Sequence, residues 1–386
     1  MSRETLRLAS LNVWALPFGI ARHVAPRMKA IGERIGELDV DVVALQEVWT
    51  EEARAALVAG GRDVGLEHIW HNPAARGGSG LLFLSRRPFV DVEFHAYTLR
   101  GLPQRVHHGD YWGGKGFALA RLETEGGPVT LLDTHLHAQY TDDPIDEYRG
   151  MRTGQAIQLA ATVRGRPDPI VALGDFNLRT GNPDHAVLMG LSGFTDVALA
   201  LDNPQDTILT DHPYRGGGHS EGERIDYAFV RTGAQADAIP VSIEREFDAR
   251  FEVEGEPATY SDHAGLLVEV EVAASVGAAG VLPGADPVAL LRARSLLAQG
   301  RSEAQRRRGV ERSLALGAGA LAVAALPVAS QLRASRRGFL AGVAAGLGVA
   351  CLPSAGLVAM LSEVAVPAEL AAYDEVEALL DGFGPA

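Results

Sequence analysis

The stretch Val171-Ala-Leu-Gly-Asp-Phe-Asn-Leu178 is an apolar run that ends in a glycine, a carboxylate and a carboxamide. In an extended chain alternate side chains point to the same side, so Asp175 and Asn177 can reach one metal ion or one phosphate group. Taken alone, the segment is equally compatible with an ordinary turn at the end of a strand, where Asp, Asn and Gly are common. The rest of the sequence must decide between these alternatives.

Short apolar runs rich in β-branched residues recur through the first 270 residues, as is typical of strands in a buried sheet. The predicted strands are Leu6–Val13, Val40–Leu45, Leu81–Leu84, Val129–Leu132, Ile170–Leu173, Ile225–Val230 and Leu266–Val272. Helices are predicted between them at Ala25–Leu38 and Tyr148–Val163, so the fold class is α/β or α+β. Parallel and antiparallel strand orders both remain open.

Composition and charge restrict the class of protein. The 386 residues include 47% hydrophobic and 22% charged side chains, which is typical of a folded globular chain. The net charge of −14 is uneven: residues 1–275 hold 25 basic and 40 acidic side chains. Because nucleic-acid binders usually present a basic surface, no nucleic-acid partner is expected. The single cysteine, Cys351, cannot form an intrachain disulfide.

The composition changes after about residue 274, where a stretch rich in Gly, Ala and Pro is typical of a linker. Two uncharged stretches follow, Leu314–Leu332 and Gly338–Leu361. As helices they would span roughly 28 and 36 Å, enough to cross a hydrocarbon core of about 30 Å. We therefore predict a transmembrane helical hairpin, and a pair of buried core helices is the alternative. Pro287–Arg308 is predicted to form an amphipathic basic helix, either at a membrane surface or solvated.

These features divide the chain into four parts. We predict a folded domain over residues 1–274, a linker and amphipathic basic helix over 275–312, two transmembrane helices over 313–362 and an acidic C-terminal tail over 363–386. The N-terminus lacks the long apolar stretch of a secretory signal, and the arginines that flank the spans weakly favour both termini in the cytoplasm. The protein is expected to be integral to a membrane, with its folded domain in the cytoplasm. The oligomeric state is left open.

Polar side chains stand at the ends of several predicted strands. Asn12 interrupts the apolar pattern of the first strand, Glu47 follows the second, and His135 ends a third. Asp262 and His263 come just before the last strand. Each is ordinary by itself, as a turn residue, a helix N-terminal carboxylate or a surface imidazole. Their ordered occurrence at strand ends across 250 residues predicts a common site.

The ordered set resembles the endonuclease/exonuclease/phosphatase superfamily. Its pattern is matched by Asn12, Gln46-Glu47, Thr134-His135, Gly174-Asp175-Phe176-Asn177, Arg224-Ile-Asp226-Tyr and Ser261-Asp262-His263. The resemblance implies a four-layer α/β/β/α sandwich of the DNase I-like kind, with the active site at one end and, here, the transmembrane hairpin after it. It also implies Mg²⁺-dependent hydrolysis of a phosphodiester or phosphomonoester.

Within the superfamily the sequence resembles the neutral sphingomyelinases. The matching segments are Leu11–Pro17, Tyr97–Leu99, His107–Gly116 and Thr134–Tyr140. The animal membrane-bound enzymes of this type also carry two membrane helices after the catalytic domain, although they often have a second Glu where this chain has Gln46. The resemblance implies a phospholipase C-type enzyme that releases phosphocholine from sphingomyelin or a lyso-phosphocholine lipid in a membrane. A Mg²⁺-dependent nuclease or another phosphoesterase of the superfamily is the alternative.

The resemblance also implies roles for individual residues. Glu47 and Asn12 are expected to hold Mg²⁺, for which Mn²⁺ could substitute, and Asp262 to add a further metal contact. A hard cation of this kind prefers oxygen ligands and polarises a phosphoryl oxygen. His263 is expected to take a proton from the attacking water, because an imidazole titrates near neutral pH, and Asp226 to orient it.

The remaining expected roles concern the phosphate and a nearby loop. Asp175 and Asn177 are expected to position the water and the phosphate. His135 is expected to donate a hydrogen bond to the developing negative charge on the phosphoryl oxygens. Asp110 and Lys115 match an aspartate–lysine pair that acts as a loop switch beside the site in the neutral sphingomyelinases, and a plain turn lysine is the alternative.

An apolar patch lies next to Asn12 in the sequence. It consists of Trp14, Leu16, Phe18 and Ile20. The patch is compatible with insertion into lipid beside the active site and, equally, with a buried corner after the first strand.

Overall fold

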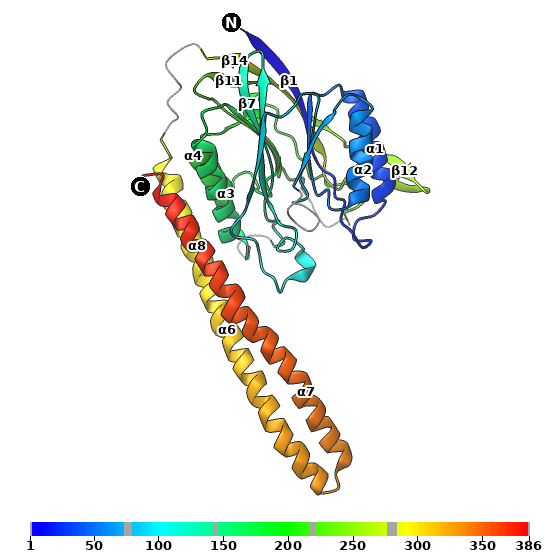
Figure 1. Ribbon diagram of the computed structural model, residues 1–386, viewed down its shortest axis with the longest axis vertical. Helices are drawn as coiled ribbons and strands as arrows, with labels where there is room; N and C mark the ends of the chain where they lie inside the picture. Colours follow the sequence, from blue (N-terminus) through cyan, green and yellow to red (C-terminus); the bar gives the residue numbers. More distant parts are fainter. Residues whose placement is uncertain (1, 73–78, 142–145, 216–220, 276–283, 385–386) are drawn as a thin grey trace.

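The computed structural model describes residues 2–72, 79–141, 146–215, 221–275 and 284–384. Two six-stranded sheets stack face to face (Figure 1). In spatial order the first sheet contains β11 (Ala236–Glu246), β14 (Gly265–Ala274), β1 (Arg3–Asn12), β2 (Val42–Gln46), β4 (Leu82–Ser85) and β3 (His68–His71). The second contains β5 (Asp91–Ala96), β6 (Gly116–Thr124), β7 (Gly127–His135), β8 (Ile170–Asp175), β10 (Asp226–Arg231) and β9 (Thr195–Asp196). A small ribbon of β12 (Phe251–Val253) and β13 (Glu256–Ala258) stands apart.

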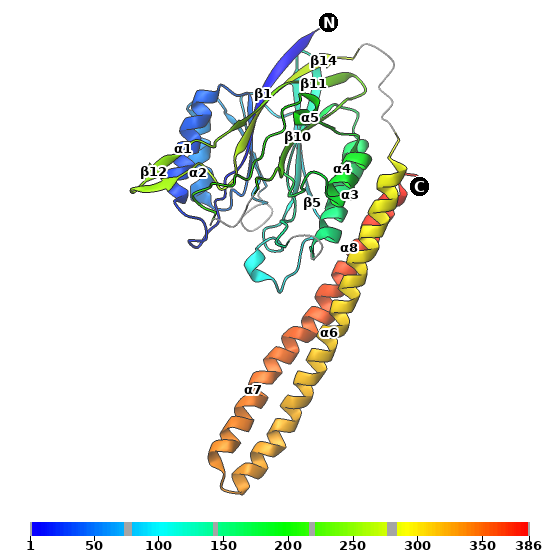
Figure 2. The same ribbon diagram turned by 180° about the vertical axis from the view of Figure 1, so that it is seen from behind.

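Helices cover the outer faces of both sheets (Figures 1 and 2). The helices of the body are α1 (Val24–Leu38), α2 (Glu51–Arg62), the turn η1 (Val106–His108), α3 (Arg149–Arg164), α4 (Pro183–Ser192) and α5 (Val197–Ala200). The pair α1 and α2 packs on the first sheet, and α3 and α4 pack on the second. The predicted four-layer α/β/β/α sandwich is confirmed.

The alternation of apolar side chains along the strands fills three separate core layers. On β8, Leu173 points into the layer between the two sheets, whereas its neighbour Ala172 faces α3. On β1, Leu8 lies between the sheets and Ala9 faces α1. This period of two is what a strand buried on both faces requires. Every strand predicted from an apolar run overlaps an observed strand.

Strand direction gathers the strand ends at one edge of the sandwich. The pairs β1–β2 and β7–β8 are parallel, so their carboxyl ends lie side by side. The strands β10 and β14 run antiparallel to β8 and β1 and therefore begin at that same edge. The register sets His135 opposite Asp175, and Asp226 opposite Asp175. The polar residues at the strand ends are thereby brought to one place.

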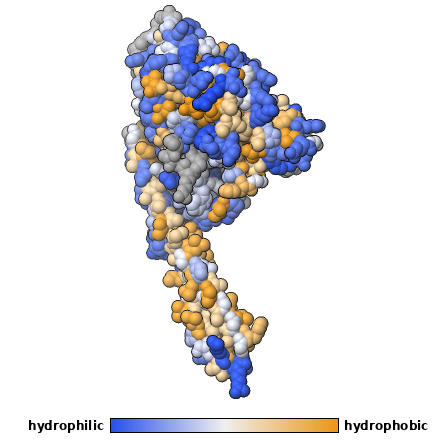
Figure 3. Space-filling view, turned by 45° about the vertical axis from the view of Figure 1, so that its right-hand side comes forward, coloured by the Kyte–Doolittle hydropathy of each residue, from blue (hydrophilic) through white to orange (hydrophobic). Residues whose placement is uncertain are grey.

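The C-terminal part is a long helical hairpin that extends away from the sandwich (Figures 1 and 2). It consists of α6 (Pro287–Ala334), α7 (Gly338–Met360), a π-helical turn η2 (Leu361–Ala365) and α8 (Val366–Asp381). Both arms are long and apolar enough to cross a membrane, and their apolar stretches are only 6% and 11% buried. In the described structure these stretches are therefore not buried as core helices would be. Figure 3 shows apolar side chains along the outside of the hairpin.

The first part of α6 is docked on the sandwich, which differs from both sequence-based alternatives, a membrane-surface helix or a solvated one. Its apolar side chains pack with α3, α4 and α8 in one buried cluster. The crossing of α3 and α6 is close, since a Cβ added to Gly150 would lie 2.8 Å from the Cα of Gly300. The acidic segment after the second span contains α8, whose Tyr373 and Val376 are buried in the same cluster. Most of the predicted linker, residues 276–283, lies outside the described residues.

Arginines near the middle of α6, just before its uncharged stretch, face acidic side chains of η2 and α8. Arg308 lies 3.1 Å from Glu363, and Arg307 pairs with Glu369. Arg312 also pairs with Glu363. The basic cluster therefore ties the two arms of the hairpin together just before the apolar spans.

This docking leads to a prediction about truncation. A chain cut after residue 274 loses the helices that cover α3 and α4, and each large apolar side chain left uncovered costs about 1.5–3 kcal/mol. A chain that lacks only residues 314–361, with a short Gly/Ser linker in their place, keeps that cover. We expect the internal deletion to be soluble and to melt near the temperature of the full chain in detergent, and the cut at 274 to melt well below it or aggregate. Equal melting temperatures of the two shortened chains would show that the docking is weak.

Candidate active site

Carboxylates from two sheets converge at the shared edge. The Asn12 side-chain amide donates to Glu47 Oε1 and to Asp175 Oδ2, each at 3.0 Å. Asn12 and Asp175 are buried, and Glu47 is nearly so. Asn12 at the end of β1 thus holds together one carboxylate from each sheet.

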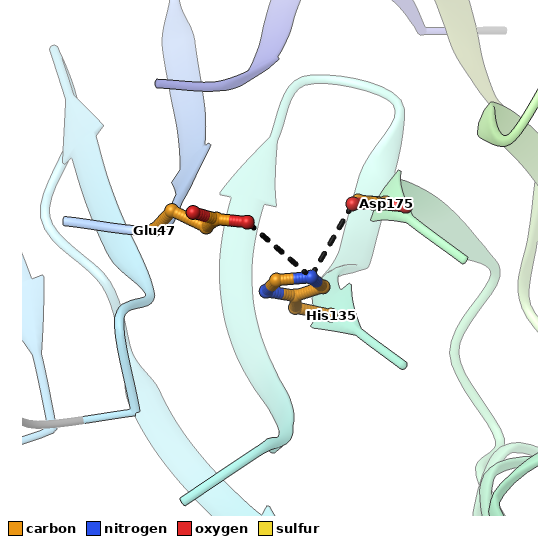
Figure 4. A group of neighbouring side chains, drawn as sticks. All are labelled: Glu47, His135 and Asp175. Carbon is orange, nitrogen blue, oxygen red and sulfur yellow. Dashed lines mark ion pairs between the residues drawn. The ribbon is translucent and has the colours of Figure 1, made fainter. Parts of the chain in front are cut away.

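His135 lies between those two carboxylates (Figure 4). Its Nε2 atom is 3.3 Å from Asp175 Oδ2 and 3.8 Å from Glu47 Oε1. Burial by itself raises the pKa of Asp175, but the charges of His135 and His263 outweigh it, and the pKa of Asp175 lies below its usual value. Asp175 is therefore an ionised, acceptor-only group at neutral pH.

Asp110 and Lys115, the pair predicted from the sequence to act as a switch, contact each other and reach into the same site. Lys115 and Asp110 make a buried ion pair. Lys115 Nζ also lies 2.9 Å from His135 Nε2 and donates to the Leu136 carbonyl at 2.7 Å. Burial raises the pKa of Asp110, but the Lys115 ammonium outweighs it and holds that pKa below its usual range. Lys115 thereby connects the loop that carries Asp110 to the edge where His135 lies.

His263 and Asp226 form the second half of the site. The Nδ1 atom of His263 is 2.9 Å from Asp226 Oδ2, and both residues are buried. Burial disfavours the imidazolium, but the charges of Asp226 and Asp262 outweigh it and raise the pKa of His263 to about 10. The contact through Nδ1 leaves Nε2 as the atom available for proton transfer.

Several residues of the site have backbone φ angles in the positive range, which most residues avoid. Gly174 has a φ of 133°, and a Cβ there would lie 2.2 Å from the Thr134 carbonyl oxygen, so only glycine fits. Asn177 has a φ of 50° and Glu47 a φ of 59°, in the left-handed region that non-glycine residues seldom adopt. Such strained positions cluster at active sites. The Asn177 side chain donates to the Leu136 carbonyl at 3.0 Å.

A cavity of about 840 Å³ is lined by several of these groups, including Glu47, His135, Asp175, Asn177 and His263. Asp262 lies at its wall, where it pairs with Arg215 at 3.0 Å. A second ion pair in the lining joins Arg179 and Glu223 at 2.8 Å. Neither arginine was predicted from the sequence, because a single arginine in a loop has no distinguishing pattern.

A buried polar bridge beneath the site was also missed by sequence reasoning. The Gln46 side-chain amide donates to Asp133 Oδ1 at 2.6 Å, and both side chains are fully buried. Gln46 precedes Glu47 and Asp133 lies two residues before His135, so the bridge joins β2 to β7 directly behind two residues of the site. It connects the two sheets where the apolar layer between them ends.

The donor set fits a divalent cation. Ligand atoms of Glu47, His135 and Asp175 lie within 4.8 Å of one another, and those of Asp175, Asp226 and His263 do as well. Glu47 Oε2 is buried without a hydrogen-bond partner among the described residues. A buried, unpartnered carboxylate oxygen is costly unless a cation or water binds it. Of the residues expected to hold the metal, Glu47 stands in such a group, and Asn12 and Asp262 lie beside these groups.

Buried histidines predict acid sensitivity. Burial lowers the pKa of His137 and of His212 to about 4, below the value of about 6.5 in an unfolded chain. Between these values the unfolded chain binds more protons, so the free energy of unfolding falls as pH falls from 6.5 to 4. For His137 the slope approaches about 1.4 kcal/mol per pH unit.

We expect the melting temperature of the full chain in detergent to drop over that pH range, and to drop less in His212→Gln. The exposed His107, replaced in the same way, serves as the control. A pH dependence that is unchanged in His212→Gln would contradict a contribution from this imidazole.

Curated relatives match more than half of the chain. The chain is 31% identical over 274 residues to a protein of Drosophila melanogaster named putative neutral sphingomyelinase, covering 69% of this chain and 61% of the fly protein. It is 30% identical over 231 residues to the inositol phosphosphingolipids phospholipase C of Schizosaccharomyces pombe, covering 58% and 52%. The chain thus spans between half and two thirds of the length of these two relatives.

Solved structures place the sandwich in a known fold class. The sphingomyelinase C of Streptomyces griseocarneus superposes with a TM-score of 0.52 at 19% identity, over 69% of this chain and 99% of that one. D. rerio TDP2 bound to a single-strand DNA product gives 0.54 at 18%, over 69% and 98%. A Staphylococcus aureus beta toxin mutant with bound magnesium ions gives 0.51 at 18%, over 70% and 100%. At these identities the likeness establishes the fold alone.

The family follows from the sequence match. Residues 9–263 match the model of the Endonuclease/Exonuclease/phosphatase family, and they include every residue of the converging site. The chain belongs to this family.

Proposed function

We propose that this protein is a Mg²⁺-dependent phosphodiesterase of the phospholipase C type that hydrolyses sphingomyelin or a lyso-phosphocholine lipid to phosphocholine and the lipid alcohol. The observation that carries the proposal is the convergence of Glu47, His135, Asp175 and the His263–Asp226 pair at one cavity. The names of the fly and yeast relatives support a sphingolipid substrate. The magnesium ions bound to the Staphylococcus aureus beta toxin mutant, which shares the fold, support magnesium as the cation.

The donor groups suggest which residues would hold the cation. Glu47 and Asp175 offer carboxylate oxygens, and Asn12 positions both. Mg²⁺ prefers such oxygen ligands, and Mn²⁺ accepts the same set with a nitrogen from His135. When bound, the cation polarises a phosphoryl oxygen and neutralises charge that develops during attack. Asp262, paired with Arg215, would contribute through the electrostatic field at the cavity wall.

The remaining groups would move the proton and hold the phosphate. In its neutral form His263 accepts a proton from water at Nε2, while Asp226 fixes the ring through Nδ1. The water oxygen bonds to phosphorus as the bond from phosphorus to the lipid oxygen breaks. The lipid oxygen takes up a proton from solvent and is released as the alcohol, and His263 returns the proton it accepted to solvent. Asn177, His135 and Lys115 would donate hydrogen bonds to the phosphoryl oxygens. The position of the loop that carries Asp110 would then decide whether Lys115 can contact the phosphate, which is the switch role expected from the sequence.

We propose that the hairpin of α6 and α7 makes the protein integral to a membrane, with the sandwich on the cytoplasmic side. The low burial of the apolar stretches supports the insertion. The proposed division into 1–274, 275–312, 313–362 and 363–386 then describes a catalytic domain, a linker with the basic helix, two spans and an acidic end. The first part of α6, up to Ala304, and α8 pack on the proposed catalytic domain.

The test compares substrates for the full chain in detergent micelles. We expect Mg²⁺-dependent release of phosphocholine from sphingomyelin and lyso-platelet-activating factor, with phosphatidylcholine slower. A site that hydrogen-bonds the amide or hydroxyl of the preferred lipids rejects an analogue without it by up to about 10⁴–10⁵-fold, whereas apolar contacts give about 10–200-fold. Equal rates on all three lipids would remove the selectivity. Faster cleavage of plasmid DNA or of a soluble inositol phosphate would overturn the lipid substrate itself.

A further inference from the structure

Large apolar side chains stand exposed on two loops that line the cavity. On the loop between β1 and α1, Phe18 is 97% and Ile20 is 62% exposed. On the loop that includes η1, Val106 is 67% and Trp112 is 63% exposed. All four residues line the cavity. We call these four side chains the apolar rim.

The start of the first loop is held in place by the side chain of Arg27. The buried guanidinium of Arg27 donates to the carbonyls of Val13 and Trp14 at 2.7 and 2.8 Å. The same guanidinium lies 5.1 Å from the Trp14 ring centre, and the Tyr214 ring packs on Trp14 at 5.2 Å. Phe18 itself has a φ of 62°, a left-handed conformation that is costly for a large side chain. A supported loop therefore presents Phe18 to solvent at a conformational cost.

The second loop is supported as well. Tyr140 hydrogen-bonds to Asp110, and its ring stacks on His108 at 3.8 Å. Gly113 rests against the Trp49 ring, where a Cβ would come within 2.8 Å. Val106 and Trp112 are thus exposed on a loop whose position is fixed by contacts with neighbouring side chains.

Both loops lie on the side of the sandwich toward which the hairpin extends. In Figures 1 and 2 the dark blue loop after β1 and the cyan loop around η1 lie at the end of the body that faces along the hairpin. The uncharged stretch of α6 begins at Leu314, after the buried contacts of α6 with α3, α4 and α8 have ended. A bilayer entered by the spans would therefore face the two loops that line the cavity.

We propose that the apolar rim docks into the same membrane leaflet that the hairpin enters, so that the cavity opens directly onto the lipid headgroups. This inference rests on the proposed function, because a lipid substrate stays in the bilayer and must reach Asp175 and His263 through that mouth. Exposed apolar patches with a polar surround mark interaction surfaces, and aromatic side chains such as Phe18 and Trp112 suit the boundary between water and hydrocarbon. The occupant is the lipid surface, because the rim lies on the side of the sandwich toward which the apolar stretches of the hairpin extend.

A direct test places an environment-sensitive probe on the rim. In the full chain with Cys351→Ala, a nitrobenzoxadiazole label is attached to Phe18→Cys or Val106→Cys, and the protein is reconstituted in phosphatidylcholine vesicles with sphingomyelin at about one lipid in ten. The matched control is Val90→Cys, which is 57% exposed and is not among the described residues that line the cavity. We expect the rim labels to gain at least about twofold in intensity and to be quenched by brominated lipid, and the control label to do neither. Rim labels that behave like the control label would overturn the proposal. An increase of label intensity in detergent that depends on protein concentration would also overturn it, because it would indicate that the rim contacts a second copy of the chain.

A second measurement separates docking from chemistry. For Phe18→Ser with Val106→Ser, we expect the ratio of vesicle sphingomyelin hydrolysis to hydrolysis of soluble p-nitrophenyl phosphocholine to fall at least about tenfold, with Val90→Ser unchanged. An unchanged ratio would overturn the docking role. If the wild-type chain hydrolysed neither substrate while the rim labels still entered lipid, the proposed function would fail and the docking would stand.

Discussion

Replacing His263 by alanine is expected to lower kcat for phosphocholine release by about 10²–10⁴-fold, with a much smaller effect on KM. The reason is that, in the proposed mechanism, Nε2 of this ring accepts the proton of the attacking water, while Nδ1 contacts Asp226 at 2.9 Å. Asp226→Asn should cost less than His263→Ala, and the double variant should be no worse than His263→Ala. Residues that act as one unit give such non-additive losses.

The pH profile supplies a readout that a purely structural role would not change. Because the pKa of His263 is raised and only the neutral ring accepts a proton, kcat/KM of the wild-type chain should rise with pH. A cation bound beside Asp175 would oppose the imidazolium and shift this rise to lower pH. The rise should vanish in His263→Ala. His185→Gln, a buried histidine on α4, is the matched control. A variant of His263 that kept both its rate and its rising profile would exclude this residue as the base.

Replacing Glu47 by glutamine is expected to raise the Mg²⁺ concentration for half-maximal activity by more than about 100-fold. Loss of a partner that only orients a metal ligand already costs about 10–100-fold in affinity, and Glu47 offers a carboxylate oxygen directly. The expectation rests on the buried Oε2 atom of Glu47, which lacks a partner in the described part of the chain, and on its closeness to His135 and Asp175.

Metal binding can be measured without turnover. Titration of the full chain with Mn²⁺, followed by electron paramagnetic resonance, should show a site that is lost in Glu47→Gln and kept in Glu52→Gln, an exposed residue of α2. Excess EDTA should abolish hydrolysis, and added Mg²⁺ should restore it. Full activity in EDTA, or equal Mn²⁺ affinity in both variants, would remove Glu47 from the metal site.

The local pattern of the sequence was sufficient for the most apolar strands and for the residues at their ends, but it missed β3, β5, β6, β9, β11, β12 and β13. Alternating apolar side chains such as Ala172 and Leu173 predict a strand buried on both faces, because each face must meet a different core layer. Gly174 and Asp175 mark the end of that strand, since the close approach to Thr134 admits only glycine. The uncharged length of the two C-terminal stretches likewise predicted helices that need no cover from the body.

Several features depend on contacts between residues far apart in the chain. Lys115 touches His135 only because β6 and β7 are neighbours, and Gln46 meets Asp133 across the gap between the sheets, 87 residues away. The docking of α6 and α8 on α3 and α4 was missed because an amphipathic helix has the same pattern on a membrane, in solution or against another helix.

The sequence by itself determined the family, the positions of the strand ends and the identity of the groups at those ends, because these depend on residue type and on periods of two to four residues. Only the tertiary structure decided which groups meet, how the cavity is walled and which way it faces. Parallel pairing of β1 with β2 and of β7 with β8 gathers Asn12, Glu47, His135 and Asp175 at one edge. The packing of α6 against the sandwich then fixes the direction of the hairpin, and with it the side from which a membrane lipid would reach those groups.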